Sequence, residues 1–222
     1  MSGGRDDLCF LAMGFALSLA LLPLLSAVDP GSLQDFCVAV EDPNNSVFVN
    51  GNLCKDPNRV TADDFFLSGL DQPGNTSNPV GSKVTLINAD RIPGLNTLGI
   101  SLARVDYVPN GGLNPPHYHP RATEVFLALE GKFYAGFVAS NPDRLISKIL
   151  NPGDVFVFPA GRIHFQYNIG STAGRAVSGL SSQNPGIVVV ANSVFGSGID
   201  PSVLARAFQV DRELVEQLRK KF

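Results

Sequence analysis

Three histidines and one glutamate, grouped in two short blocks, are the residues best suited to chemistry. The first block contains His117, His119 and Glu124. The second block contains His164, and the sequence has no histidine outside these blocks. Three neutral imidazoles and one carboxylate suit a divalent transition metal, and the absence of sulfur ligands argues against Cu(I) or an iron–sulfur cluster.

The spacing of these residues indicates strands that position them. In a strand, His117 and His119 are two residues apart and therefore project from the same face. Glu124 has the wrong parity for the same straight strand, but Pro120 breaks that strand, and a bend can return the carboxylate to the same side. Gly161 turns the chain into a further strand that brings in His164.

Around these blocks, the chain consists of short apolar segments separated by Gly, Pro, Asn or Asp. Strands at this spacing favour an antiparallel sandwich or barrel over a helical bundle. We expect strands at 83–88, 98–107, 125–129, 132–139, 155–158, 164–169 and 187–193. Some are apolar on both faces, which indicates that partner subunits cover the outside of the barrel.

The end of the chain has a different, helical pattern. Asp200 followed by a proline predicts an N-cap and a helix over 202–208. Asp211 can cap a second helix, which carries a single apolar stripe. Because a finished barrel leaves this pair of helices little core to join, we expect it to pack on another subunit.

The first residues have the pattern of a secretory signal peptide. A charged start precedes an almost wholly apolar run from Leu8 to Leu25, and a small-residue cleavage site ends at Ala27. The alternative is a signal anchor that stays in the membrane, and Pro23 within the run argues against it. We therefore expect a secreted protein that has no membrane contact after cleavage.

Two cysteines and two sequons agree with secretion. After cleavage only Cys37 and Cys54 remain, and two cysteines in an oxidising compartment most simply form one disulfide. A zinc or redox site is the weaker alternative, because two thiols alone do not complete a tetrahedral set. Asn44 and Asn75 begin N-glycosylation sequons in turn-rich stretches, where we expect exposed loops and attached glycans.

The overall composition excludes two classes of function. The 222 residues are 44% apolar and 17% charged, and the formal net charge is −3. This balance excludes a basic nucleic-acid-binding surface as the default and also a disordered acidic tail. We predict a signal peptide, a disulfide-stapled loop-rich extension, a barrel and a C-terminal oligomerisation segment, at 1–27, 28–82, 83–199 and 200–222.

The two metal-ligand blocks resemble the two cupin motifs, G-x5-H-x-H-x4-E-x6-G and G-x5-P-x-G-x2-H-x3-N, with every fixed position filled. Phrases at 94–99, 114–117 and 182–186 are similar to those of plant germin-like proteins. The resemblance implies an all-β fold, namely a single cupin jelly-roll β-barrel with C-terminal α-helices. It also implies a homohexamer built as a trimer of dimers, located in the extracellular space and cell wall of the plant, the apoplast.

The same resemblance implies the metal and the residues that bind it. It implies a disulfide between Cys37 and Cys54, and manganese as the cofactor of His117, His119, Glu124 and His164. The best-defined enzymes of the family oxidise oxalate to carbon dioxide and hydrogen peroxide. Their pocket resembles this one at Asn114, which is a candidate for orienting a metal-bound carboxylate.

Those enzymes also carry an asparagine where this sequence has Ala103. One lost hydrogen bond to a charged group is worth about 1.5–3 kcal/mol, which argues against oxalate oxidase activity. We therefore expect a manganese oxidoreductase that removes superoxide, a small anion, and produces hydrogen peroxide in defence or cell-wall processes. A non-enzymatic defence or wall glycoprotein with a stabilising metal is the alternative, and oxalate oxidase ranks third.

Overall fold

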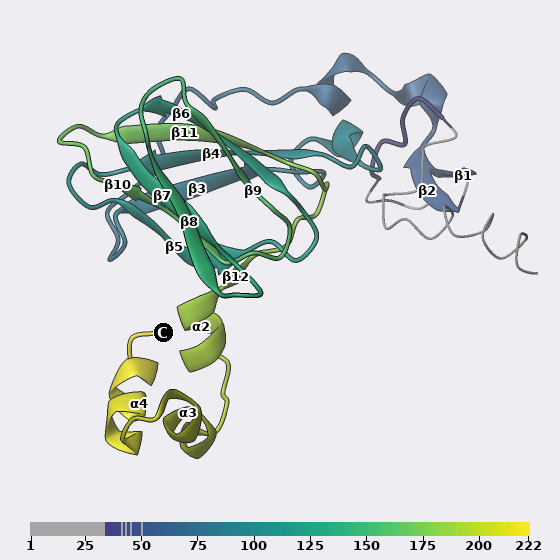
Figure 1. Cartoon of the computed structure of the whole chain (residues 1–222). Helices are drawn as coiled ribbons and strands as arrows, with labels where there is room; N and C mark the ends of the chain where they lie inside the picture. Colours follow the sequence, from purple (N-terminus) through teal and green to yellow (C-terminus); the bar gives the residue numbers. More distant parts are fainter. Residues whose placement is uncertain (1–33, 41, 43, 45, 50) are drawn as a thin grey trace, which may run out of the picture. The chain divides into compact units, whose positions relative to one another are not determined.

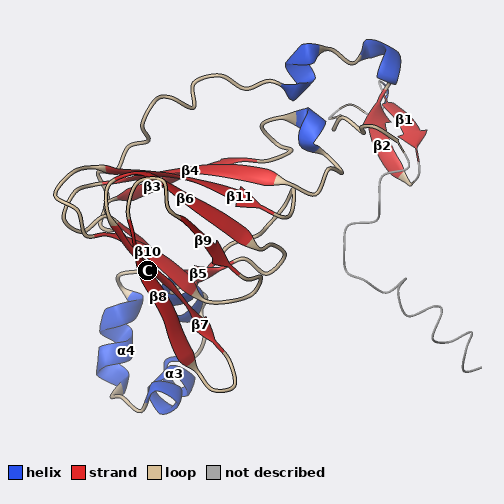
Figure 2. Ribbon diagram, turned by 45° about the horizontal axis from the view of Figure 1, so that its top comes forward, coloured by secondary structure: helices blue, strands red, loops and turns tan. Residues whose placement is uncertain are grey.

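Two five-stranded antiparallel sheets hold most of the strands in the computed structural model (Figure 1). One sheet has the order β12-β5-β10-β7-β8, and the other has the order β3-β4-β11-β6-β9. Figure 2 shows the strands stacked as two layers. The strand bounds are β3 Ser82–Ile87, β4 Ser101–Tyr107, β5 Leu113–Tyr118, β6 Glu124–Glu130, β7 Phe133–Ala139, β8 Arg144–Leu150, β9 Val155–Phe158, β10 His164–Asn168, β11 Gly174–Leu180 and β12 Val188–Val189. This arrangement confirms the predicted all-β class.

The structure describes residues 34–222, apart from 41, 43, 45 and 50. The predicted signal peptide at 1–27 lies outside the described residues. Among the helices that are described, none is long and apolar enough to cross a membrane.

The residues before the sheets contain a small hairpin and the disulfide. The hairpin consists of β1 Ser46–Val49 and β2 Asn52–Lys55. A disulfide joins Cys37 to Cys54, which lies in β2. Two short 3-10 helices follow the hairpin, η3 Pro57–Arg59 and η4 Ala62–Phe65. A third, η5 Pro93–Leu95, lies between β3 and β4.

The apolar core lies between the two sheets and follows from alternation along the strands. In β6, for example, Glu124, Phe126 and Ala128 are buried, whereas Val125 and Leu129 are exposed. The residues that face inwards therefore come from one side of each strand. The main core cluster is Val105, Tyr107, Phe126, Ala128, Phe133, Ala135, Leu150, Phe158 and Ala176.

Two strands, β8 and β11, were not expected, and one expected strand is wrong. β5 is the strand that the spacing of His117 and His119 indicates, although no bounds were predicted for it. The apolar run predicted as a strand over 187–193 forms only the two residues of β12 and then the helix α2, Val190–Phe195. β12 pairs with the last two residues of β5, so the run has no partner strand beyond that point. An apolar run without alternation does not distinguish a strand from a buried helix.

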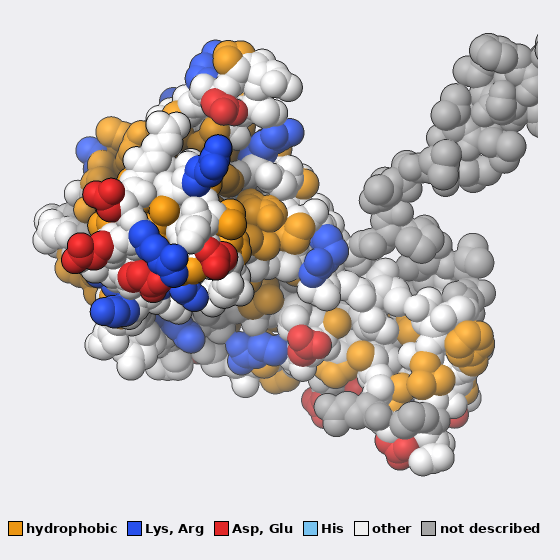
Figure 3. All heavy atoms as spheres, turned by 90° about the horizontal axis from the view of Figure 1, so that it is seen from below, with side chains coloured by type: hydrophobic (Ala, Val, Ile, Leu, Met, Phe, Trp, Pro, Cys, Tyr) orange, Lys and Arg blue, Asp and Glu red, His pale blue; other side chains and the backbone are white. Residues whose placement is uncertain are grey.

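Two further helices end the chain: α3 Pro201–Phe208 and α4 Arg212–Arg219. The Asp200 side chain accepts a hydrogen bond from the Ser202 amide, as the predicted N-cap requires. Asp211 occupies the N-cap position of α4, but its side chain makes no capping hydrogen bond. Seen from below, apolar side chains lie exposed among charged ones (Figure 3). On these two helices, Val203, Phe208 and Leu214 are exposed.

Candidate metal centre

Strands of both sheets position the four predicted ligands. His117 lies in β5, and His119 follows directly after that strand. His164 begins β10, which pairs with β5 so that His164 is opposite His117. Glu124 begins β6 in the other sheet. The predicted bend at Pro120 is therefore the crossing of the chain from one sheet to the other.

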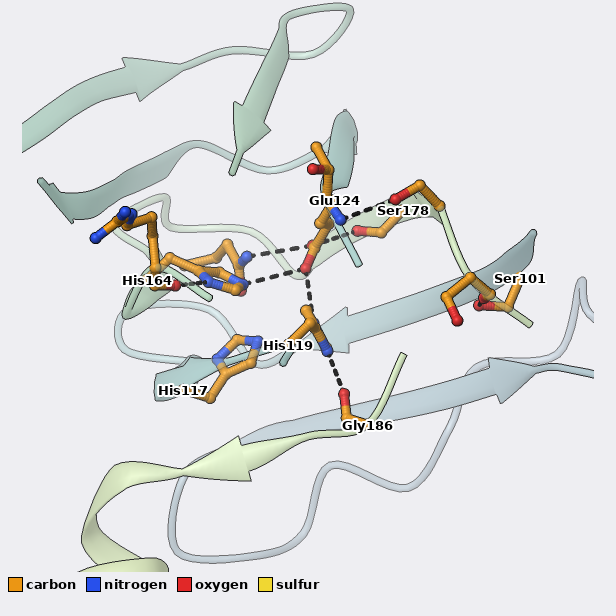
Figure 4. A network of polar contacts seen from close by, with 12 residues as sticks. Ser101, His117, His119, Glu124, His164, Ser178 and Gly186 are labelled. Carbon is orange, nitrogen blue, oxygen red and sulfur yellow. Dashed lines mark hydrogen bonds and ion pairs between the residues drawn. The ribbon is translucent and has the colours of Figure 1, made fainter. Parts of the chain in front are cut away.

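The four side chains converge in the interior. Their ligand atoms all lie within 4.8 Å of one another, and all four residues are buried. Figure 4 shows the imidazoles and the carboxylate pointing towards one another. The Glu124 Oε2 atom is 3.1 Å from the Nε2 atoms of both His119 and His164.

Each imidazole is oriented by a backbone carbonyl at its outer nitrogen. The Nδ1 atoms of His117, His119 and His164 lie 2.7, 2.6 and 2.8 Å from the carbonyl oxygens of Pro115, Gly186 and Arg162. Because a carbonyl only accepts, Nδ1 carries the proton, and the inner Nε2 of a neutral ring presents a lone pair. This orientation by a second partner is typical of metal-binding histidines.

The donor set fits a cation. In a neutral ring whose proton is on Nδ1, the Nε2 atom is a hydrogen-bond acceptor. The Nε2 atoms of His119 and His164 nevertheless lie at hydrogen-bond distance from a carboxylate oxygen of Glu124, which is also an acceptor. Such close acceptors require a proton or a metal ion between them. The three imidazole nitrogens and one carboxylate therefore suit a divalent metal.

The pKa values favour the metal-binding forms of two ligands. Burial, with a smaller effect of His164, lowers the pKa of His117 to about 4, so this imidazole is neutral at pH 7. Burial alone would raise the pKa of Glu124, but the close contacts of its carboxylate with His119 and His164 hold that pKa well below its usual range. The pKa of His119 is raised, because its contacts with Glu124 and Gly186 outweigh the opposite effect of burial.

Two further residues support Glu124, and the sequence assigned neither of them this role. The Ser178 hydroxyl donates to Glu124 Oε1 over 2.7 Å, and the Gln166 amide lies 3.4 Å from the same oxygen. Ser178 comes from β11, which carries no recognisable strand pattern. Gln166 lies two residues after His164 on the same inward face of β10, and this spacing is the one signal that points to it.

The loop 182–187 supports His119 through a backbone carbonyl. Its Gly186 carbonyl contacts His119 Nδ1, and the Arg121 side chain donates to the backbone and side chain of Asn184. Gly186 has a φ of +64°, and a Cβ there would lie 2.9 Å from Arg121 Nη2. A glycine is therefore required for this loop to reach the imidazole.

A cavity of about 360 Å³ opens onto the ligands His117, His119 and Glu124. Asn114, the predicted substrate-orienting residue, lines this cavity and is 8% exposed. Ala103 also lines it, as a methyl group on the wall formed by β4. The structure thus brings Asn114 together with the four predicted ligands.

The other predicted site residues lie away from the cavity. Cys37 and Cys54 form the disulfide in the structure. Asn44 and Asn75 are both exposed, so their sequons are accessible. Attachment of glycans to these two residues stays a prediction.

The fold and the site define the class of the protein as a cupin: the cupin family matches residues 68–216. The chain belongs to the germin-like proteins of this class. It is 59% identical over 207 residues to germin-like protein subfamily 1 member 17 of Arabidopsis thaliana, covering 91% of this chain and 93% of that one. Subfamily 1 member 16 of Arabidopsis thaliana is 58% identical over 212 residues, covering 94% of this chain and 95% of the relative.

A solved structure of an oxalate oxidase is also similar to this chain. The two share 45% identity with a TM-score of 0.80, and the match covers 87% of this chain and 98% of the oxalate oxidase. The expected family and barrel are thereby confirmed.

Proposed function

We propose that this protein is a secreted, manganese-binding protein of the plant apoplast that removes superoxide and acts in defence or cell-wall processes. The observation that carries the proposal is the buried group of three oriented imidazoles and one carboxylate, a donor set that suits a divalent cation. Nitrogen and oxygen donors without sulfur are compatible with manganese. The germin-like relatives support this assignment through family membership.

The residues of the chain would hold the ion and admit a small anion. Bound manganese supplies the one-electron couple by which two superoxide ions and two protons become one hydrogen peroxide and one dioxygen. The single carboxylate, Glu124, leaves a net charge of +1 on a divalent ion, and this charge attracts an anion. Ser178 and Gly186 hold Glu124 and His119 in place, and the cavity gives access to them.

The test is to measure metal content and superoxide removal on the same purified protein. We expect about one manganese per chain and a rate of superoxide removal that rises in proportion to manganese content. A fully manganese-loaded protein that removes no superoxide would leave the metal with a stabilising role. The alternative, a non-enzymatic defence or wall glycoprotein, would then replace the enzymatic proposal.

Oxalate oxidase is a further candidate because of the similar solved structure. Asn114 is buried beside the ligands and can donate to a metal-bound carboxylate. Ala103, by contrast, presents only a methyl group to the cavity. Oxalate oxidation therefore ranks below superoxide removal.

We further propose assembly into a homohexamer, a trimer of dimers. Apolar side chains lie exposed on the outer face of one sheet, and Val155 and Val157 of β9 are 55% and 47% exposed. Exposed apolar patches of this kind mark interaction surfaces. By light scattering, we expect the mass of six chains for the unaltered protein.

We predict that the double variant Val155→Lys/Val157→Lys and truncation after Gly198 both give smaller species, because each removes apolar surface. Asn151→Lys, in an exposed turn just before β9, is the matched control for added charge and should leave the mass unchanged. An unaltered protein that is monomeric at micromolar concentration would contradict the assembly proposal.

A further inference from the structure

The cavity at the metal centre has an almost wholly apolar wall. Its apolar lining includes Val84, Leu86, Ala103, Val105, Leu180 and Ile187. Apart from Glu124, which is one of the proposed ligands, no aspartate, glutamate, lysine or arginine is among the described residues that line it. A ligand that carries a second charge would therefore have to bury that charge without a partner, which is costly.

The volume of the cavity exceeds what a small anion needs. About 360 Å³ lies within the range of roughly 300–1,000 Å³ found for small-molecule pockets. Superoxide or oxalate would leave most of this space unused. An apolar group attached to the anion would fill it and would contact Leu86 and Leu180.

One polar group beside the ligands is free to bind a carboxylate. Asn114 is 92% buried, given its exposed fraction of 8%, and its side-chain amide makes no hydrogen bond with any described residue. The register of β5 against β10 is irregular between Asn114 and His117, so both side chains face the interior although they are three residues apart. The free amide therefore lies on the ligand side of a cavity whose wall is mostly apolar.

We propose that the site binds monocarboxylates with an apolar body of about four to eight carbon atoms. The carboxylate lies at the metal and accepts a hydrogen bond from Asn114, and the apolar body packs against Leu86 and Leu180. This inference rests on the metal assigned under the proposed function. It goes beyond that function, because it assigns a ligand whose binding depends on the apolar wall of the cavity as well as on the charge of the metal centre.

The experiment measures dissociation constants of acetate, butyrate, hexanoate and succinate by calorimetry on the manganese-loaded protein. Each buried methylene should tighten binding about fourfold, so butyrate should bind about 15-fold more tightly than acetate, and hexanoate more tightly still. Succinate, which equals butyrate in length but carries a second charge, should bind at least about tenfold more weakly than butyrate.

Two variants locate the selectivity. Leu86→Asn should weaken hexanoate binding by about tenfold while leaving acetate binding nearly unchanged, because only the apolar body contacts this wall. Asn114→Leu should weaken the binding of all monocarboxylates by about 10-fold or more. Leu145→Asn, on the exposed face of β8, is the matched control and should have no effect.

Manganese content is measured on every sample before calorimetry. A metal-loaded protein that binds acetate as tightly as hexanoate, or succinate as tightly as butyrate, overturns this inference and leaves the proposed function standing. A purified protein that takes up no metal overturns both. Should Leu86→Asn fail to fold, the chain-length series on the unaltered protein still decides the question.

Discussion

Replacing His119 by alanine is expected to abolish metal binding. The variant removes one of three imidazole ligands and leaves Glu124 Oε2 without one of the two nitrogens that now lie 3.1 Å from it. Loss of an outer partner of a metal ligand typically costs about 10–100-fold in affinity, and loss of a ligand itself should cost more. After dialysis, elemental analysis should therefore find almost no manganese, and superoxide removal should fall with it.

A graded series of variants tests this assignment. Ser178→Ala removes only the hydroxyl that supports Glu124, so it should weaken metal binding by about 10–100-fold without abolishing it. Tyr118→Phe changes a residue of β5 between two ligands and should bind metal normally. A His119→Ala protein that keeps one manganese per chain would show that the ligand assignment is wrong.

Replacing Ala103 by asparagine should raise oxalate oxidation. Ala103 lines the cavity and is 5% exposed. It pairs with Ser178 of the neighbouring strand β11, so a new amide at this position is held close to the metal centre. A hydrogen bond to a charged group is worth about 1.5–3 kcal/mol, equivalent to about 10- to 150-fold in rate. Superoxide removal should change little, because the four ligands are untouched.

The measurement compares hydrogen peroxide release from oxalate with superoxide removal at equal manganese content. Ala103→Leu, which adds bulk without a donor, is the control and should give no gain with oxalate. Robust oxalate turnover by the unaltered protein would reverse the order of the two activities. An Ala103→Asn variant with no gain would show that a donor at this position does not limit oxalate turnover.

The metal ligands could be predicted because their chemistry and spacing are local. His117 and His119 share a strand face by simple alternation, and turn residues precede His164. Asp200 likewise predicts the N-cap of α3, which depends only on residues beside it. Such signals need no knowledge of the rest of the fold.

The rest depends on contacts between distant parts of the chain. β8 lies at a sheet edge and is mostly exposed, so its sequence has no regular alternation. β11 is central but rich in small residues, because a Cβ at Gly174 would lie 2.8 Å from the ring of Phe133. Ser178 therefore could not be recognised as the residue that holds Glu124.

The metal ligands come from both sheets, and this affects which metal ion the protein retains. His117 and His164 belong to one sheet and Glu124 belongs to the other. An ion bound by all three would therefore link the two sheets. Its release breaks bonds to residues of both layers, so we expect the bound ion to exchange slowly through the cavity. Since selectivity among divalent metals depends on geometry, ligand type and metal availability, a slowly exchanging ion should reflect the ions present where the protein folds more than those where it works.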